Sequence, residues 1–419
     1  MAGTVIEYLQ KYGDISFREK PLNDVDSLAL CQLSYLKFDG MVSDVRHNGP
    51  SVTLREIAER PDVDKLFGDV RFEKENRALF EGMLSGRRFR DMKLNCYINL
   101  VEKEWETQFS AITFILDDGT LFLAFRGTDE TIIGWKEDFN MAFQYPVPAQ
   151  RSASAYLDMV ARLWEGPIIL VGHSKGGNLA IYAAMNADPK VRKRIQHVYS
   201  LDGPGFPPEI VTSPAYRTIQ PKVTKIVPSS SIVGMIFETP EPCRVVSSDS
   251  NGIMQHSAFT WLLDGDQFIT EPDLSSSSQL FNEELNHWIA TLTPEQRERA
   301  VDALFTVLHA NGATSFSEVM SNFPASIPAM LGAYVGLTPA DRRHLVEALA
   351  ILFKASTAKR KPTPAPASAP SSATSKATAE IPAETAAGAD SAAPARADTD
   401  ADAGTTASPS AEDATEIAD

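Results

Sequence analysis

The residues best suited to do chemistry lie in one short glycine-rich run. Residues 172–176 read GHSKG, the pattern G-x-S-x-G, and another glycine follows at 177. A short apolar segment, residues 167–171, comes directly before the run, and residues 177–187 are predicted to form a helix. A serine in a sharp turn between a buried strand and a helix projects above the sheet and can act as a nucleophile. Ser174 is therefore the candidate nucleophile, and the turn requires small residues at Gly172 and Gly176.

A phosphate-binding glycine turn is the alternative interpretation of this run. Such turns come with a lysine followed by serine or threonine, or with a second glycine fingerprint. The sequence has neither next to residues 172–177. The strand before the serine and the helix after it favour the nucleophile.

A nucleophilic serine needs a base, and seven histidines are available. In folds with this turn the chain order is serine, acid, then histidine. His256 follows the predicted strand Arg244–Ser247 and the loop 249–252, and it precedes a predicted short helix, Ser257–Leu263. It is the candidate base. The other histidines precede the serine, lie within the turn or fall in predicted strands and helices: His47, His173, His197, His287, His309 and His344.

Two aspartates compete as the acid that orients the base. Asp202 ends the predicted strand Ile195–Leu201 and enters a glycine-rich loop at the carboxyl edge of the sheet, within reach of an imidazole there. Asp249 lies seven residues before His256, in a loop where solvent exposure is the simpler interpretation. The segment after the next strand, residues 228–231, has no carboxylate. Asp202 leads by elimination, and Asp249 stays the alternative.

The negative charge that develops on a substrate oxygen needs two donors. The backbone N–H of Lys175, the residue after the serine, is the first. The second is the N–H of Thr128, with a contribution from its hydroxyl, in the loop that follows the predicted strand Thr120–Phe125. The Lys175 side chain is expected to lie in solvent. Gly134, Trp135 and Asp138 are expected to pack around this loop and cap it.

The elements that must position these residues alternate between strand and helix. The runs Phe109–Leu116 and Thr120–Phe125 flank Asp118-Gly119 and predict a hairpin. Short strands separated by helices follow, at 167–171, 195–201, 223–227 and 244–247, and they predict a mostly parallel sheet with helices on both faces. We expect a helical N-terminal region (1–92), an α/β core (93–270) and a helical C-terminal region (271–355).

The chain has 419 residues and a formal net charge of −16, from 39 basic and 55 acidic residues. Residues 362–419 hold ten acidic and only two basic residues, hence half of that charge, and no aromatic residue. Such a composition cannot offset the entropy of ordering, so residues 356–419 are expected to form a disordered acidic tail rich in Ala, Pro, Ser and Thr. The acidic balance argues against nucleic acid as a partner.

No transmembrane segment or secretory signal is predicted, and three widely spaced cysteines fit neither a disulfide framework nor a zinc site. We therefore expect a cytoplasmic protein that needs no metal and no cofactor. The sequence leaves the oligomeric state open.

At these motifs the sequence resembles α/β-hydrolases of the lipase class 3 type. The resemblance rests on FRGT (125–128), GWxxD (134–138) and GHSxGG (172–177), and it covers about residues 95–265. The chain is most similar to the bacterial Mbeg-like family, through DSLAL (26–30), SLDGPGF (200–206), PSSSIVGM (228–235) and QHS (255–257). The resemblance implies an α/β-hydrolase fold with Ser174 as nucleophile, His256 as base, and the Thr128 and Lys175 amides as oxyanion donors.

Two positions depart from the class 3 pattern. Class 3 lipases have leucine where Lys175 stands, and their acid lies in a D-x-V-P segment where this chain has residues 231–234, SIVG. The position of the family's acid therefore cannot be transferred to this chain.

Two functions follow as hypotheses. The first is a serine esterase that forms an acyl-enzyme on Ser174 and prefers small or medium acyl esters to bulk lipid. The second is a hydrolase-fold protein of little or no activity that binds a ligand or a protein. Labelling of Ser174 by a fluorophosphonate distinguishes them.

Overall fold

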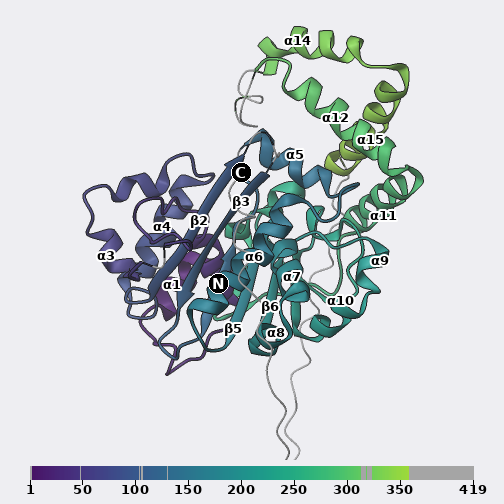
Figure 1. The fold of residues 1–419 in the computed structure, drawn as a ribbon. Coiled ribbons are helices and arrows are strands. Elements are labelled where there is room, and N and C mark those ends of the chain that lie inside the picture. The colour runs from purple at the N-terminus through teal and green to yellow at the C-terminus, as the bar shows by residue number, and fades with distance from the viewer. Residues whose placement is uncertain are drawn as a thin grey trace, which may run out of the picture. The chain divides into compact units, whose positions relative to one another are not determined.

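An eight-stranded sheet forms the centre of the computed structural model, which describes residues 2–47, 49–102, 104, 107–129, 131–312, 318 and 323–357 (Figure 1). The strands follow one another across the sheet in chain order. The first four pair antiparallel and strands four to eight pair parallel. They are β1 (Val52–Thr53), β2 (Lys93–Glu102), β3 (Thr107–Ile115), β4 (Leu121–Phe125), β5 (Ile168–His173), β6 (Ile195–Leu201), β7 (Val223–Pro228) and β8 (Cys243–Val246). A two-stranded sheet, β9 (Leu263–Asp264) with β10 (Gln267–Phe268), follows.

Strand β4 shows why the sheet is buried on both faces. Its five residues are all apolar and all buried. Phe122 and Ala124 belong to one apolar cluster, and Leu121, Leu123 and Phe125 belong to another. Successive side chains of a strand point to opposite faces, so a continuous apolar run requires a layer of helices on each side.

The N-terminal helices cover one of these faces. They are α1 (Val5–Tyr12), α2 (Asp24–Leu33), α3 (Leu54–Ala58) and α4 (Glu73–Ser85), with a 3₁₀ turn, η1 (Val63–Phe67). Leu28 and Leu30 of α2 lie in the same apolar cluster as Val171 of β5 and Leu201 of β6. Gly3 also pairs with Leu263 of β9 through two backbone hydrogen bonds of 3.0 and 2.8 Å. The N-terminal region therefore shares its core with the sheet.

Helices from the middle of the chain cover the opposite face. The long ones are α6 (Pro148–Leu163) and α7 (Lys175–Asn186), which lie in front of the sheet in Figure 1. Ala183 of α7 and Leu157 of α6 lie in one cluster with Leu170 of β5. The remaining elements are α5 (Ile132–Asn140), α8 (Pro189–Arg194), α9 (Pro208–Val211), α10 (Pro214–Ile219), η2 (Gln220–Lys222), η3 (Val233–Met235), η4 (Gly252–His256) and η5 (Ala258–Thr260).

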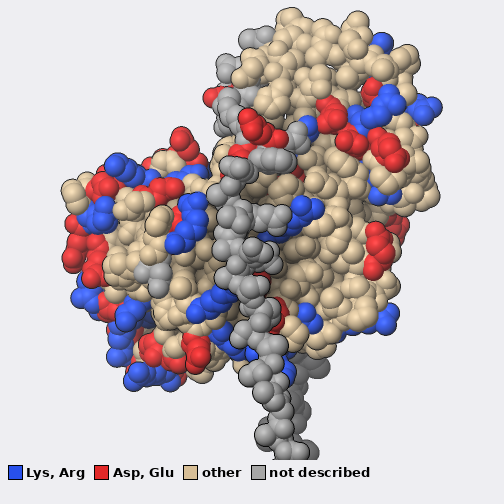
Figure 2. All heavy atoms as spheres, in the orientation of Figure 1, with Lys and Arg blue, Asp and Glu red and all other residues tan. Residues whose placement is uncertain are grey.

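The last part of the described chain is helical. It comprises α11 (Ser276–Thr291), α12 (Pro294–Leu308), α14 (Phe323–Gly336) and α15 (Pro339–Thr357). Helix α14 has no charged residue, and its surface is uniformly tan in Figure 2, whereas acidic and basic side chains alternate over the N-terminal helices. Within the described residues, no helix is long and apolar enough to cross a membrane. The predicted acidic tail lies outside the described residues, apart from the end of α15.

The predicted hairpin and the α/β-hydrolase fold, with its mostly parallel sheet and helices on both faces, are confirmed. Gly119, in the hairpin turn, has φ of +84°, which glycine adopts without strain. The predicted helix Ser257–Leu263 is wrong. These residues form the 3₁₀ turn η5 and lead into β9, because Ser248 pairs with Trp261 and the buried Trp261 indole donates to the Gln255 carbonyl.

Candidate active site

Ser174 occupies the sharp turn between β5, which ends at His173, and α7, which begins at Lys175. Its φ of +58° and ψ of −133° place it in a region that non-glycine residues rarely adopt, at a cost of about 1–3 kcal/mol. The flanking glycines leave no room for side chains. A Cβ on Gly172 would lie 2.0 Å from the Gly176 carbonyl, and one on Gly176 would lie 2.1 Å from the Phe125 carbonyl oxygen. The turn is therefore held by close backbone contacts on both sides.

Asp202 and His256 meet at the carboxyl edge of the sheet. Asp202 directly follows β6, is fully buried, and its Oδ2 lies 2.6 Å from Nδ1 of His256. Its Oδ1 accepts hydrogen bonds from the Ser231 hydroxyl (2.5 Å) and the Gly234 amide (3.2 Å). Burial alone would raise the pKa of Asp202, but the hydrogen bond and charge of His256 hold that pKa below its ordinary value. An ionised Asp202 accepts a hydrogen bond from the Nδ1–H group of His256. In that tautomer Nε2 of His256 carries no proton and can act as an acceptor.

The loop that carries His256 is anchored by its neighbour. Gln255 is fully buried, and its side-chain oxygen accepts the Ser230 amide at 2.8 Å while its amide group donates to the Ser250 carbonyl at 3.0 Å. His256 itself stays partly accessible, with 21 % of its side chain exposed. A fixed backbone and an accessible ring suit a group that exchanges protons with a ligand.

Asp249, the alternative acid, lies elsewhere in the loop. Its side chain is exposed, and its backbone amide donates to the Thr260 carbonyl at 3.0 Å. In the described chain, its carboxylate makes no hydrogen bond or ion pair with His256. Of the two candidates, Asp202 is the one that contacts His256, the candidate base.

His173, the residue before Ser174, contacts His256. The His173 Nε2 lies 2.7 Å from the His256 carbonyl oxygen, and the two imidazole rings are 4.6 Å apart. Within the described residues, no hydrogen bond joins Ser174 Oγ to His256 Nε2. Catalytic hydrogen bonds of this kind often form only when a substrate is bound.

The loop after β4 brings Thr128 next to the serine turn. Phe125 of β4 pairs with Gly172 of β5, and a Cβ on Gly127 would lie 3.0 Å from Cβ of Ser174. The Thr128 hydroxyl donates to Oδ2 of Asp138. Over the described ranges, the amides of Thr128 and Lys175 donate no hydrogen bond, so both are available to an oxygen of a ligand.

The Lys175 side chain is buried, and the expectation that it lies in solvent is wrong. Its exposed fraction is 1 %, and its Nζ donates to the Gln108 carbonyl (2.8 Å) and to Oε2 of Glu137 (2.9 Å). Burial alone would lower the pKa of Lys175, but the charges of Glu137 and Asp138 hold that pKa above its ordinary value. The ammonium stays inside because two carboxylates compensate its charge.

Tyr35 is a site residue that sequence reasoning missed. Its hydroxyl lies 2.9 Å from Nδ1 of His173. Burial lowers the pKa of His173 to about 3, so the ring is neutral, and Nε2, which faces a carbonyl, must carry the proton. Tyr35 therefore donates to Nδ1, and its hydroxyl also lies against Gly127, where an added Cβ would be 2.4 Å from it. These contacts connect the loop after β4, the serine turn and the His256 loop.

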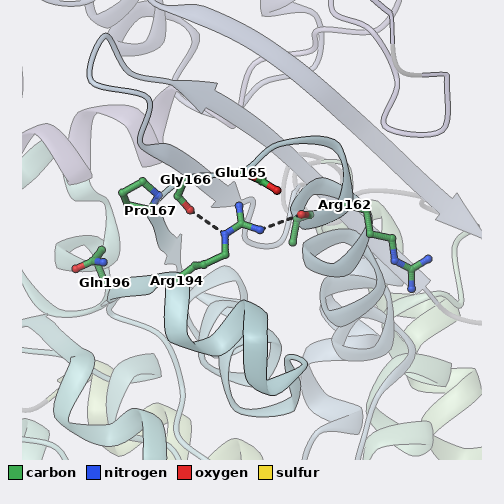
Figure 3. A pocket seen from close by; sticks show the side chains of 7 residues that line it. Arg162, Glu165, Gly166, Pro167, Arg194 and Gln196 are labelled. Atoms are coloured by element: carbon green, nitrogen blue, oxygen red, sulfur yellow. Dashed lines mark hydrogen bonds between the residues drawn. The ribbon is translucent and has the colours of Figure 1, made fainter. Parts of the chain in front are cut away.

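One surface depression lies away from these residues. It has a volume of about 430 Å³ and sits at the amino ends of β5 and β6 (Figure 3). Its Arg194 guanidinium is engaged by the carbonyls of Ala161, Trp164 and Gly166 at 2.6–2.9 Å. In the described part of the chain, no cluster of three or more His, Cys, Asp or Glu could hold a metal ion.

The sequence family is decided by a match that spans the whole site. The model of the Mbeg1-like family matches residues 83–306, more than half of the chain and every candidate catalytic residue. The chain belongs to the Mbeg1-like family. The Mbeg1-like segment leaves out Tyr35 and the helices α1 to α3. Comparison with curated proteins gives no match.

Two lipases are among the solved structures similar to this Mbeg1-like chain. M37 lipase has 13 % sequence identity and a TM-score of 0.29, over 51 % of this chain and 68 % of the lipase. The propeptide complex of Rhizomucor miehei lipase has 14 % identity and a TM-score of 0.32, over 60 % and 71 %. At such low sequence identities and TM-scores, the similarity does not indicate an activity for this chain.

Proposed function

We propose that this protein is a serine hydrolase that cleaves carboxylic esters. Ser174 is the nucleophile, His256 the base, Asp202 the acid that orients the base, and the amides of Thr128 and Lys175 bind the oxyanion. The observation that carries this proposal is the 2.6 Å contact between His256 Nδ1 and a buried carboxylate that has its own donors on the other oxygen. A histidine held in this way keeps Nε2 free to accept a proton.

The reaction has two halves. Ser174 Oγ attacks the ester carbonyl carbon while its proton moves to Nε2 of His256, and the two amides stabilise the negative charge on the carbonyl oxygen. The imidazolium then protonates the leaving alcohol and an acyl-enzyme remains. Water, deprotonated by His256, attacks the acyl carbon and releases the acid and the serine.

The residues beside His256 favour an ester substrate that has an apolar acyl or alkyl group. Ile253 and Met254 precede it in η4 and have 56 % and 46 % of their surface exposed. Apolar side chains beside the base can contact an acyl or alkyl chain of small or medium length. The three unpaired cysteines fit a reducing, cytoplasmic environment.

One observation favours the second candidate, a binding protein with little activity. Ser174 Oγ and Nε2 of His256 share no hydrogen bond among the residues described. A site that stays in this arrangement with substrate bound would not activate the serine.

A fluorophosphonate probe tests the proposal, because it modifies only a serine that is activated by a base and an oxyanion hole. We expect wild type to be labelled, Ser174→Ala to be unlabelled, and the control Ser152→Ala, on α6, to be labelled like wild type. A folded wild-type protein that is not labelled, or a labelled Ser174→Ala, contradicts the proposal.

A further inference from the structure

A buried ammonium and two carboxylates lie directly behind the proposed oxyanion hole. The Lys175 side chain runs from the start of α7 to Gln108 on β3 and to Glu137 on α5. Asp138 is the next residue, and its Oδ1 lies 3.6 Å from Lys175 Nζ. Lys175 is thus held by its side chain to the helix that also holds Thr128 through Asp138.

Glu137 connects three other elements through one fully buried carboxylate. Its Oε2 accepts Lys175 Nζ at 2.9 Å and the Gln108 amide at 3.0 Å, and its Oε1 accepts the Ala149 amide at the start of α6 at 2.8 Å. The carboxylate thereby fixes β3, α6 and α7 relative to α5. An isolated buried charge would be very unfavourable, so each partner requires the other.

Both donors of the oxyanion hole depend on this arrangement. The first donor is the amide of Lys175 itself. The second is in Thr128, whose hydroxyl is bound to Asp138. Burial raises the pKa of Asp138 to about 6, although the nearby Lys175 opposes that rise, so the lysine helps to keep Asp138 ionised at neutral pH. A shift of either amide would weaken oxyanion binding, because donors act only within a narrow range of distance.

We propose that the Lys175–Glu137 ion pair positions the oxyanion hole: it holds the Lys175 amide and, through Asp138, the Thr128 loop in the geometry that binds the oxyanion. The inference rests on the proposed hydrolase function. Lys175 contributes its amide to catalysis, whereas its ammonium and Glu137 are positioning groups that touch no substrate. The leucine that class 3 lipases have at this position cannot form an ion pair. The lysine at residue 175 is therefore matched in this chain by the carboxylate of Glu137.

The test separates stability from positioning. Lys175→Met alone leaves the buried Glu137 carboxylate without its ion-pair partner. It is therefore expected to lower the midpoint of unfolding in urea strongly. Lys175→Met with Glu137→Gln replaces both charges by neutral groups of similar size and is expected to recover most of that midpoint. Because Asp138 and the Lys175 amide still lack the ammonium that holds them, kcat of the double variant should stay about 10–100-fold below wild type with KM within about 2-fold.

Lys136→Met is the matched control. Lys136 lies on the same helix as Glu137, and its ammonium pairs with Asp302 of α12 (3.0 Å), so kcat should equal that of wild type. A double variant with recovered stability and wild-type kcat refutes the positioning role and leaves the hydrolase proposal standing. A wild type that shows neither ester turnover nor fluorophosphonate labelling refutes both proposals.

Discussion

Replacing Asp202 by asparagine exchanges one carboxylate oxygen for an NH₂ group. The groups that donate hydrogen bonds to this side chain determine which oxygen is replaced. The Ser231 hydroxyl and the Gly234 amide both donate to Oδ1. The asparagine must therefore keep its oxygen on that side and turn its NH₂ group toward Nδ1 of His256. Facing a donor, Nδ1 becomes an acceptor and the proton moves to Nε2. The base can then no longer take the proton of Ser174.

The size of the effect follows from this change of tautomer. In serine triads, an aspartate-to-asparagine change that leaves the wrong tautomer lowers kcat by about 10⁴-fold. This corresponds to about 5.4 kcal/mol of transition-state stabilisation at 1.36 kcal/mol for each tenfold change. The substitution retains size and the two hydrogen bonds at Oδ1, so the fold and KM should change little.

Hydrolysis of p-nitrophenyl esters of short acyl chains measures the effect. Asp249→Asn is the control, because its exposed carboxylate does not contact His256, and its kcat should stay within about twofold of wild type. The reasoning is wrong if Asp202→Asn keeps more than a tenth of the wild-type kcat. It is equally wrong if Asp249→Asn loses as much activity as Asp202→Asn.

Three further predictions concern the support of the site. Tyr35→Phe removes the donor to Nδ1 of the buried His173 and should lower the free energy of unfolding in urea by about 1–3 kcal/mol; an unchanged value argues against this hydrogen bond. The folded-state pKa of His173 is about 3 against an ordinary 6.5, so its contribution to stability is complete above pH 6.5 and is lost as the pH falls toward 3. Between pH 7.5 and 5 this loss is about 2 kcal/mol, and His173→Gln, measured in urea at both pH values, should be less sensitive to pH by that amount. Gly176→Ala should not yield folded protein, because its Cβ would lie 2.1 Å from a carbonyl oxygen. The control Gly332→Ala, on α14, should raise the thermal midpoint slightly, because a Cβ there has no neighbour within 4 Å. Circular dichroism measures folding and the thermal midpoint of both variants.

The parts of the fold that sequence could predict are those with local signals. The hairpin, the strand before Ser174 and the helix after it each follow from a few adjacent residues. The position of Asp202 also followed, since it comes directly after a strand whose carboxyl end must lie at the same edge as the serine. The predicted helix Ser257–Leu263 failed because a tertiary contact, the hydrogen bond of the Trp261 indole, overrides its helical pattern.

The missed residues act across long separations. Lys175 contacts Glu137 and Gln108, which are 38 and 67 residues away along the chain, and Tyr35 is 138 residues from His173. Pairings of this kind leave no periodicity in the sequence. From sequence alone, the lysine after Ser174 is therefore expected to lie in solvent, and only the fold shows the carboxylates of Glu137 and Asp138 beside it.

The pairing of Gly3 with Leu263 has a consequence for synthesis on the ribosome. At about 5–20 residues per second, Leu263 is made roughly 13–50 s after Gly3. During that interval the N-terminal segment lacks this pairing partner, although β5 and β6, which share an apolar cluster with α2, are complete by residue 201. His256 also emerges late, so the hydrogen-bond chain from Tyr35 to its carbonyl closes only near the end of this interval. If the proposed function holds, a growing chain carries Ser174 without the groups that activate it.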